Sequence, residues 1–444
     1  MIGRIRYWRE MERWVPGGPA AMDVAFPLVP MGDLLHPRRE VVREAQFADC
    51  QPITIHFDGS IDPRDRTEPF KGSMFAAYPG DVVFSKIDVR NGAITIVPPK
   101  FSKVVVTSEY PIHVPDTKQV DPRYLALLLR SPNFLHLLKS AATGTSGRKR
   151  VDAENFAELE IPLPDPPEQT ALLDAYQSAS NAAVAIEADA KAAEVKSIRE
   201  FEAALGLIPP ADVPHRLLQV ARYRDMNRWG HEALLQQASR ERTLAHSQTA
   251  ESEPVPLGDF VEVTHGCSAS PSDTPTALEV LKISACTRGF FRPSEKKYAP
   301  DRPELRKKFD LRKGDVLMCR VNGTLAYVGM SALVEEDMPD LIFPDKIIRV
   351  RITSDELLPD FLWRLLQLPA MRTQIESVSR TAVGNHAIGS EDINDLQIAI
   401  PSKEKQIELT NSLQVARNKA TALRTEAARI RAAAWGEFLN AVFH

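Results

Sequence analysis

The sequence repeats itself along its length, and this repeat constrains the fold more than any local motif. Residues 122–129, PRYLALLL, align with residues 359–366, PDFLWRLL, at an offset of 237 positions. The offset holds without a gap to Phe201 and Phe438. It also relates Pro132 to Pro369, Gly147 to Gly384, Leu159 to Leu396, Ile161 to Ile398, Pro164 to Pro401 and Gln169 to Gln406. The chain is therefore a tandem duplication, with units of slightly over 200 residues.

Upstream of this block the offset shrinks, as loop insertions in the second copy would produce. Three further pairs of segments align at offsets of 234, 226 and 215: Gly80–Val83 with Gly314–Leu317, Pro30–Asp33 with Pro256–Asp259, and Arg9–Trp14 with Arg224–Trp229. We expect Trp14 and Trp229 to be core or interface anchors, and the role of residues 1–25 stays open.

Short β-branched runs near the start of each copy indicate strands. An Asn91-Gly92 turn separates two such runs in the first copy, and Asn322-Gly323 has the same place in the second. Asn-Gly between such runs is a strong hairpin signal. The predicted strands are 82–87, 93–97 and 104–107, then 316–321, 324–334 and 346–352. A helix with proline near its first turn is predicted to follow over 122–140 and over 359–376.

Each copy then ends in one long helix of about 35 residues, roughly 50 Å at 1.5 Å per residue. Apolar residues and alanines in both helices are spaced 4-3-4-3, which is a heptad seam. The seam is Leu409, Leu413, Ala416, Ala420, Leu423, Ala427, Ile430 and Ala434 in the second helix, and Leu172, Tyr176, Ala179, Ala183, Ile186, Ala190, Ala193 and Ser197 in the first. We expect its larger members to pair the helices, and its alanines to let the axes approach closely.

The two helices carry opposite charge. Residues 167–205 contain seven acids and three bases, whereas residues 403–439 contain seven bases and four acids. Opposite charge favours pairing of the two helices with each other over homodimerisation through either one. The alternative is that each helix is solvated and docks on its own domain.

These patterns predict an α+β fold with five consecutive segments. They are a first domain over 1–160, a first long helix over 161–207, a connector over 208–252, a second domain over 253–400 and a second long helix over 401–444. Each domain is expected to be a mixed α/β unit followed by its long helix.

Composition places the chain among soluble globular proteins. Apolar residues make up 43% and charged residues 26% of the 444 residues, with a net charge of −4, which argues against a uniformly basic nucleic-acid coat. We find no 18-residue apolar run and no secretory signal, so we expect no membrane association and a cytoplasmic location. The four cysteines are far apart in the sequence, so they predict neither a zinc site nor a disulfide scaffold.

The sequence lacks a recognisable catalytic motif. Gly144–Arg150 does not have the spacing of a phosphate loop, and no nucleophile elbow or HExxH is found. Asp165–Glu168 has the prolines of an amino-methyltransferase motif but Glu in place of the aromatic residue. Pro344–Lys346 lacks the second acidic residue of a nuclease site. An enzyme would therefore need a site hidden between the copies, and we expect no cofactor and no metal in this chain.

Local basic and polar groups suggest contact with nucleic acid. Arg, Asn and Gln at hairpin tips and loops are suited to base edges in the major groove, and small polar residues to phosphates. The equivalent loops 143–150 and 379–386 differ in polar chemistry within one repeated frame, as two readers of different sequences would. The candidate DNA-binding residues are Lys86, Arg90, Asn91, Ser146, Arg148, Lys149, Arg150, Arg320, Asn322, Arg380, Thr381, Asn385 and His386. Residues 288–313 carry ten bases and four acids, and this run is either a DNA surface or a solvated face.

In the order of its motifs, the chain resembles the specificity subunit of type I restriction–modification systems. The resemblance rests on Pro256–Asp259, on Gly314–Leu317 before the hairpin, on Ala142–Gly147, and on Leu159–Pro164 leading to Glu168-Gln169, with their partners in the other copy. It covers nearly the whole chain. Ser402–Gln406 departs from the pattern, since it lacks the second proline and the Glu before Gln, and Ala399 replaces a proline.

The resemblance implies two target-recognition domains, each reading one half of a bipartite site in double-stranded DNA. It implies that the two long helices form an antiparallel coiled coil, which sets the spacing and docks two DNA methyltransferase subunits. Restriction/motor subunits can join such a complex, and S-adenosylmethionine and ATP with Mg²⁺ would belong to those partners. The expected setting is phage defence in a bacterial or archaeal cytoplasm.

Two alternatives stay open. The first is the recognition subunit of a related bifunctional enzyme, in which methylation and cleavage are fused in the partner. The second is a scaffold whose repeated domains bind protein rather than DNA. Neither the DNA sequence recognised nor its spacer length follows from the residues.

Overall fold

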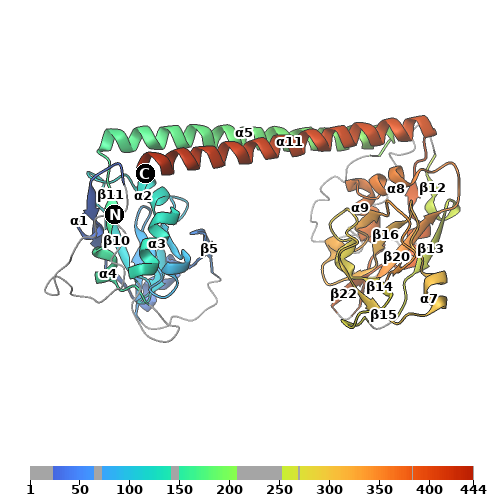
Figure 1. The fold of residues 1–444 in the computed structure, drawn as a ribbon, viewed down its shortest axis with the longest axis horizontal. Coiled ribbons are helices and arrows are strands. Elements are labelled where there is room, and N and C mark those ends of the chain that lie inside the picture. The colour runs from blue at the N-terminus through green and yellow to red at the C-terminus, as the bar shows by residue number, and fades with distance from the viewer. Residues whose placement is uncertain are drawn as a thin grey trace, which may run out of the picture. The chain divides into compact units, whose positions relative to one another are not determined.

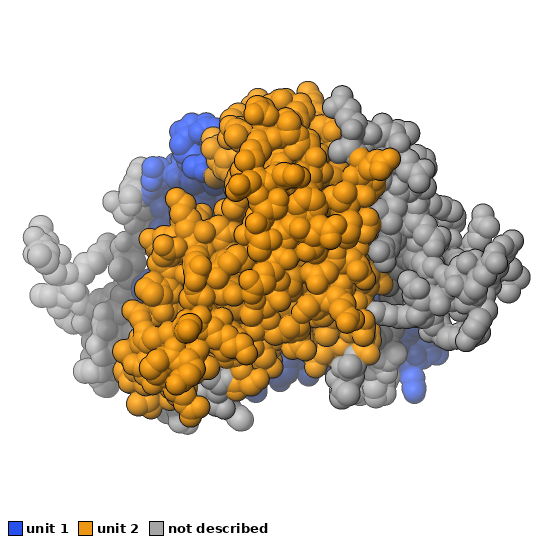
Figure 2. All heavy atoms as spheres, turned by 90° about the vertical axis from the view of Figure 1, so that its right-hand side faces the viewer, with its two compact units in different colours: residues 1–186, 425–444 blue, residues 187–424 orange. Residues whose placement is uncertain are grey.

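The computed structural model describes residues 24–64, 73–141, 150–207, 253–268, 271–382 and 384–443. The predictions for Ser146, Arg148, Lys149, Trp14 and Trp229 lie outside these residues. Two compact units make up the chain: unit 1 is Met1–Ile186 with Thr425–His444, and unit 2 is Glu187–Arg424 (Figures 1 and 2). Among the described residues no helix is long and apolar enough to cross a membrane.

The described residues of unit 1 form three sheets and four short helices. The strand orders are β1(Leu28–Pro30)-β11(Glu160–Pro162), β2(Leu35–Pro37)-β10(Ile112–Pro115)-β7(Val82–Phe84)-β8(Ile94–Ile96), and β3(Val41–Val42)-β6(Met74–Ala77)-β9(Val104–Thr107)-β4(Gln51–Ile55)-β5(Ile61–Pro63). The helices are α1(Met31–Leu34), α2(Pro122–Leu128), α3(Pro132–Ala141) and α4(Ala153–Ala157).

In unit 2, the residues that the structure describes form four sheets. Their orders are β12(Val255–Pro256)-β23(Gln397–Ile398), β13(Val261–His265)-β20(Ile347–Ile352)-β16(Val316–Cys319)-β18(Ser331–Leu333), β15(Lys296–Ala299)-β14(Leu278–Leu281)-β19(Leu341–Ile342), and β17(Val321–Asn322)-β22(Asn385–Ala387)-β21(Arg380–Ala382). The helices are α7(Pro303–Lys308), α8(Pro359–Leu365), α9(Pro369–Val378) and α10(Ser390–Asn394).

The duplication is visible in the topology. The four-stranded sheets β2-β10-β7-β8 and β13-β20-β16-β18 have the same strand order. Their strands occupy corresponding sequence positions at the shifting offsets of the repeat. Each unit therefore has the same central antiparallel sheet. The two-stranded sheets β1-β11 and β12-β23 also correspond, with the same pairing register, whereas the remaining sheets differ between the units.

The predicted helices 122–140 and 359–376 are each broken in two. α2 ends at Leu128 before α3 begins at Pro132, and α8 ends at Leu365 before α9 begins at Pro369. Proline lacks a backbone N–H and pushes the preceding residue out of the helical region. Leu368, which precedes Pro369, shows this effect, since its backbone is extended with φ −66° and ψ 144°. The prediction of a single helix was therefore wrong in both copies.

The predicted hairpin is confirmed in the first copy only. β7 and β8 pair antiparallel, with Val82 opposite Ile96, and a 3₁₀ turn over Val89–Asn91 ends at Gly92 with φ 103°. In the second copy β16 pairs with β18, but Val321-Asn322 leaves this sheet to pair with β22. The strand predicted over 324–334 is wrong except for Ser331–Leu333, because a 3₁₀ turn over Leu325–Tyr327 lies between.

The two long helices are α5(Pro166–Ala204) and α11(Lys403–Val442), and they lie side by side (Figure 1). In unit 1 the start of α5 meets the end of α11, where the Tyr176 ring lies 6.2 Å from Trp435. In unit 2 the end of α5 meets the start of α11, where Phe201 and Leu409 share one core. The helices are therefore antiparallel. Of the predicted seam, the alanines at 183, 190, 420 and 427 are fully buried.

The ends of the long helices are exchanged between the copies. Tyr124 of the first copy packs edge-on against Phe438 of α11, at 5.9 Å and 61°. The corresponding Phe361 of the second copy packs against Phe201 of α5, at 5.7 Å and 61°. Each domain core is thus completed by the end of the other copy's helix, and the alternative of each helix docking wholly on its own domain is wrong.

Candidate nucleic-acid interface

The small sheet β17-β22-β21 in unit 2 brings together the residues predicted to contact DNA. Segments more than 50 positions apart in the sequence meet here, with Asn322 opposite His386 and Thr381 opposite the same histidine. Gly384, with φ 75°, lies in the turn between β21 and β22. The six predicted residues of this copy all lie on or beside this sheet: Arg320, Asn322, Arg380, Thr381, Asn385 and His386.

Hydrogen bonds orient these side chains while leaving donors available. Arg320 donates from Nη1 to the Asp345 carbonyl at 2.9 Å, and Arg380 forms an ion pair with Asp392 at 3.1 Å. Thr381 and His386 share a hydrogen bond of 3.3 Å between Oγ1 and Nδ1. Arg380 is exposed, as are Thr381 and Asn385. A sheet edge with exposed amide, hydroxyl and guanidinium groups has the donors and acceptors that base edges require.

A cavity of about 440 Å³ adjoins this sheet, and one of its residues was missed as a site residue. His265, at the end of β13, lines the cavity together with Arg320 and Arg380. Its Nε2 lies 2.5 Å from the Ser390 hydroxyl. Burial, and then the charge of Arg320, lower the pKa of His265, so the imidazole is uncharged at neutral pH. A neutral ring can accept a hydrogen bond as well as donate one. The sequence indicated only a polar loop residue here.

In unit 1 the predicted residues fall into two groups. Lys86 and Arg150 both contact Glu109. The backbone N–H of Lys86 donates to the Glu109 backbone carbonyl at 3.0 Å, and Arg150 pairs with the Glu109 carboxylate at 3.5 Å. Arg90 and Asn91 lie on the 3₁₀ turn of the hairpin. The structure therefore places all four on or beside the hairpin.

Arg130 supports this hairpin and was also missed. Its Nη1 donates to the Gly92 carbonyl at 3.0 Å, and Nη2 donates to the carbonyl of Ile94. Burial lowers the pKa of this guanidinium. The corresponding residue of the second copy, Gln367, likewise donates to a glycine carbonyl, that of Gly289, at 2.7 Å. The sequence signal for this supporting role is that both copies have a polar residue at this aligned position, Arg130 and Gln367.

Half of the bases in the run 288–313 are paired with carboxylates. Five of its ten bases form ion pairs: Arg292 with Glu295, Lys296 with Glu279, Lys297 with Asp273, Arg306 with Asp301 and Asp340, and Arg312 with Asp310. This pairing favours the interpretation of a solvated face over that of a continuous DNA surface.

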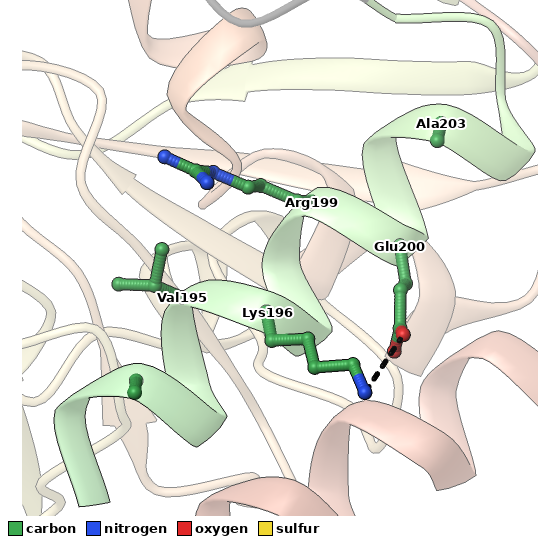
Figure 3. A pocket seen from close by; sticks show the side chains of 6 residues that line it. Val195, Lys196, Arg199, Glu200 and Ala203 are labelled. Carbon is green, nitrogen blue, oxygen red and sulfur yellow. Dashed lines mark ion pairs between the residues drawn. The ribbon is translucent and has the colours of Figure 1, made fainter. Parts of the chain in front are cut away.

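The long helices offer a second kind of surface. On α5 in unit 2, residues off the seam border a cavity of about 380 Å³ (Figure 3). Val195 and Arg199 line it, and Lys196 pairs with Glu200 one turn later at 3.8 Å. This exposed face mixes apolar and charged groups, as many protein-binding surfaces do.

The parts of the chain that the structure describes hold no cluster of three metal-ligating side chains. The four cysteines are buried, and each is a thiol rather than half of a disulfide. Burial raises the pKa of the thiols of Cys286 and Cys319, the latter to about 11, so neither is a thiolate nucleophile at neutral pH.

Comparisons with known proteins agree with this architecture. Residues 76–197 match the family model of the type I restriction modification DNA specificity domain. The type I restriction enzyme EcoEI specificity subunit of Escherichia coli is 23% identical over 86% of this chain and 75% of its own length. This chain is related to type I specificity subunits. The EcoKI specificity subunit of Escherichia coli strain K12 is 26% identical over 35% of this chain and 33% of its own length.

A solved structure has the same fold as this chain. It belongs to a study of complex assembly and conformational transition of the type I R-M system. It covers 96% of this chain and 98% of its own, with a TM-score of 0.55 and 16% identity. The arrangement of repeated domains and paired helices is therefore a known one.

Proposed function

We propose that this chain is the DNA sequence-specificity subunit of a type I restriction–modification complex. Each domain would read one half of a bipartite site, and the helix pair would set the spacing and dock two methyltransferase subunits. Catalysis would belong to those partners and to any restriction/motor subunits, together with S-adenosylmethionine and ATP with Mg²⁺. The chain itself would be a non-catalytic cytoplasmic reader.

One observation carries this proposal. The two copies share a central sheet of identical strand order, but the polar residues around it differ in type and in local structure. The first copy presents a hairpin with Lys86, Arg90 and Asn91, whereas the second presents the β17-β22-β21 sheet. A scaffold that keeps its core and changes its exposed donors and acceptors is suited to reading two unlike DNA half-sites.

The experiment is co-purification of the chain with the methyltransferase encoded beside it, followed by mapping of methylated DNA sites. We expect a split motif of two short halves with a fixed gap. A partner with fused cleavage and methylation activities would indicate the bifunctional alternative. No sequence-dependent DNA affinity, even with partners present, would favour the protein scaffold. Turnover by the purified chain alone would contradict its non-catalytic role.

A further inference from the structure

Unit 2 contains a further cavity, of about 510 Å³, on a side of the domain that includes helix α11. Four arginines line it, from four different segments: Arg288, Arg364 of α8, Arg372 of α9 and Arg417 of α11. Trp363 and Phe290 contribute aromatic rings to the same wall. We call this set the arginine pocket.

Two of these arginines meet neutral partners rather than carboxylates. Arg364 is only 7% exposed, and its Nη2 donates to the amide oxygen of Gln414. Arg417 donates from Nη2 to the amide oxygen of Gln367 at 3.1 Å. Among the described residues, no carboxylate forms an ion pair with either arginine. Arg372, by contrast, pairs with Glu376 at 3.0 Å. The charge of Asp360 acts on both Arg364 and Arg417. That of Glu194 acts on Arg417, but Glu194 pairs directly with Arg424. A buried guanidinium without a carboxylate in direct contact is unfavourable, so an anion would complete this pocket.

The geometry of Arg364 also leaves capacity for a ligand. Its guanidinium lies 3.8 Å from the centre of the Trp363 ring, and its Nε is buried with no hydrogen-bond partner in the described part of the chain. Burial, and then the charge of Arg417, lower the pKa of Arg364 to about 10. The guanidinium thus remains charged at neutral pH.

The first copy shows that the fold does not require these arginines. At the offset of 237, Arg364 corresponds to Leu127 and Arg417 to Ser180. The helix geometry is otherwise the same, since Gln177 bonds Asn181 and Gln414 bonds Asn418, both at 2.8 Å. The arginine pocket is therefore an addition to the second copy.

The surroundings favour a protein ligand over DNA. Phe290, which lines the pocket, is 51% exposed, and Trp363 and Met330 line it as well. Arginine and aromatic residues within an apolar surround are typical of the energetic centre of a protein interface, whereas DNA interfaces are more polar.

We propose that the arginine pocket binds a carboxylate side chain from an acidic segment of a partner protein. This inference rests on the proposed function, under which that partner is a methyltransferase subunit. Because the first copy has no such pocket, the two methyltransferase subunits would be held unequally by the two copies.

The test uses the full chain and the purified methyltransferase subunit. Arg364→Leu and Arg417→Ser introduce the first copy's own residues, and Lys419→Ser removes an exposed charge from α11 as a matched control. We expect calorimetric titration to show that the affinity of the tighter of the two methyltransferase-binding sites falls about tenfold or more in the first two variants and changes little in Lys419→Ser. Unchanged affinity in Arg417→Ser, with an unfolding midpoint like that of the parent, would overturn the proposal.

A photo-cross-linking residue at Phe290 identifies the occupant in the complete complex with DNA. Cross-linking to an Asp- or Glu-containing methyltransferase peptide supports the proposal, and cross-linking to DNA alone overturns it. The methylation map separates the two proposals. Variants that keep both full partner affinity and sequence-specific methylation refute only the pocket, whereas a parent complex without sequence-specific methylation refutes the proposed function.

Discussion

A single buried glutamine ties the base of each long helix to its domain. Gln169 accepts a hydrogen bond from the Asp121 N–H at 2.7 Å and donates to the carbonyls of Gln119 and Pro164 at 2.8 and 2.9 Å. Gln406 makes the corresponding three bonds, at 2.9, 2.7 and 2.9 Å. Because one amide satisfies backbone groups of two other segments, it fixes where the helix leaves the domain.

We predict that Gln406→Ala destabilises unit 2 by about 2 kcal/mol, because buried backbone groups lose their partners. Hydrogen exchange on the full chain should show reduced protection of the amides around the base of α11. Gln177→Ala, which removes an exposed glutamine of α5, is the control. Equal effects of the two substitutions would contradict the role given to the buried amide.

His113 makes unit 1 sensitive to acid. It is buried beside Phe84 and Phe156, at ring distances of 5.9 and 5.6 Å, and burial lowers its pKa from 6.5 to about 4. The unfolded chain therefore takes up a proton first as pH falls. The full stability is present above pH 6.5 and is lost progressively toward pH 4, by about 3 kcal/mol.

Urea unfolding of the full chain between pH 7 and pH 4 checks this prediction. His113→Phe keeps a ring in the same place and removes the titrating group. We expect unit 1 of this variant to lose less stability over that range than the parent. The same acid dependence in both proteins would assign it to other groups.

For DNA reading at the residue scale, we predict that Arg380→Ala with His386→Ala reduces the preference of the assembled complex for its cognate site by roughly 10- to 100-fold. Gel-shift competition between cognate and scrambled DNA at fixed salt measures this ratio, with Lys405→Ala, an exposed base on α11, as the control. For the other half-site, Arg148→Ala with Lys149→Ala is expected to abolish specific binding while leaving assembly intact. An unchanged ratio of cognate to scrambled DNA binding would show that the substituted residues do not read the DNA sequence.

At the scale of elements, the helix pair depends on small residues at its seam. Ala183, Ala190, Ala420 and Ala427 are fully buried, so the two backbones approach closely along the pair. Charge supplements this packing, since Arg424 holds Glu194 through two hydrogen bonds of 3.0 and 2.6 Å. That contact lowers the pKa of Glu194. It confirms that the opposite helix charges meet.

We predict that Leu423→Glu weakens the helix pair by about 2 kcal/mol, because a charge would replace an apolar side chain at the seam. Ala422→Glu, one residue away and exposed, is the control. Circular dichroism during heating and co-purification with partners follow the effect. A fully assembled and active complex carrying Leu423→Glu would refute the seam.

Prediction from sequence worked best where the determining contacts are local or repeated. The heptad spacing located the long helices, and the strand over Val104–Thr107 was found with the same bounds. It failed where distant segments decide, since nothing local shows that Asn322 pairs with His386 rather than closing a tight hairpin. The candidate residues could be named one by one, but their gathering on one sheet could not. DNA contact by these residues remains a prediction.

At the scale of the whole molecule, each unit is assembled from both copies. Phe438, Val442 and Phe443 of the second copy complete the core of unit 1, and Phe201 and Leu205 of the first complete that of unit 2. The compact units therefore do not coincide with the repeats in the sequence.

We predict a crossed effect for a matched pair of substitutions. Phe438→Ala should destabilise the first copy's domain and Phe201→Ala the second copy's domain, each by about 3–5 kcal/mol, because a buried aromatic ring leaves a cavity. Domain-resolved hydrogen exchange measures this. If each substitution instead loosened the domain of its own repeat, the exchanged helix ends would be refuted.

The contact between the two ends of the described chain has a consequence for biosynthesis. Val24 pairs with Phe443, and the Ala25 N–H donates to the Val442 carbonyl at 3.2 Å. During translation the first domain is made early but waits for the last residues before its core closes. The second domain has all of its residues once Arg424 has emerged from the ribosome. The part of the protein that is synthesised first is therefore the part that matures last.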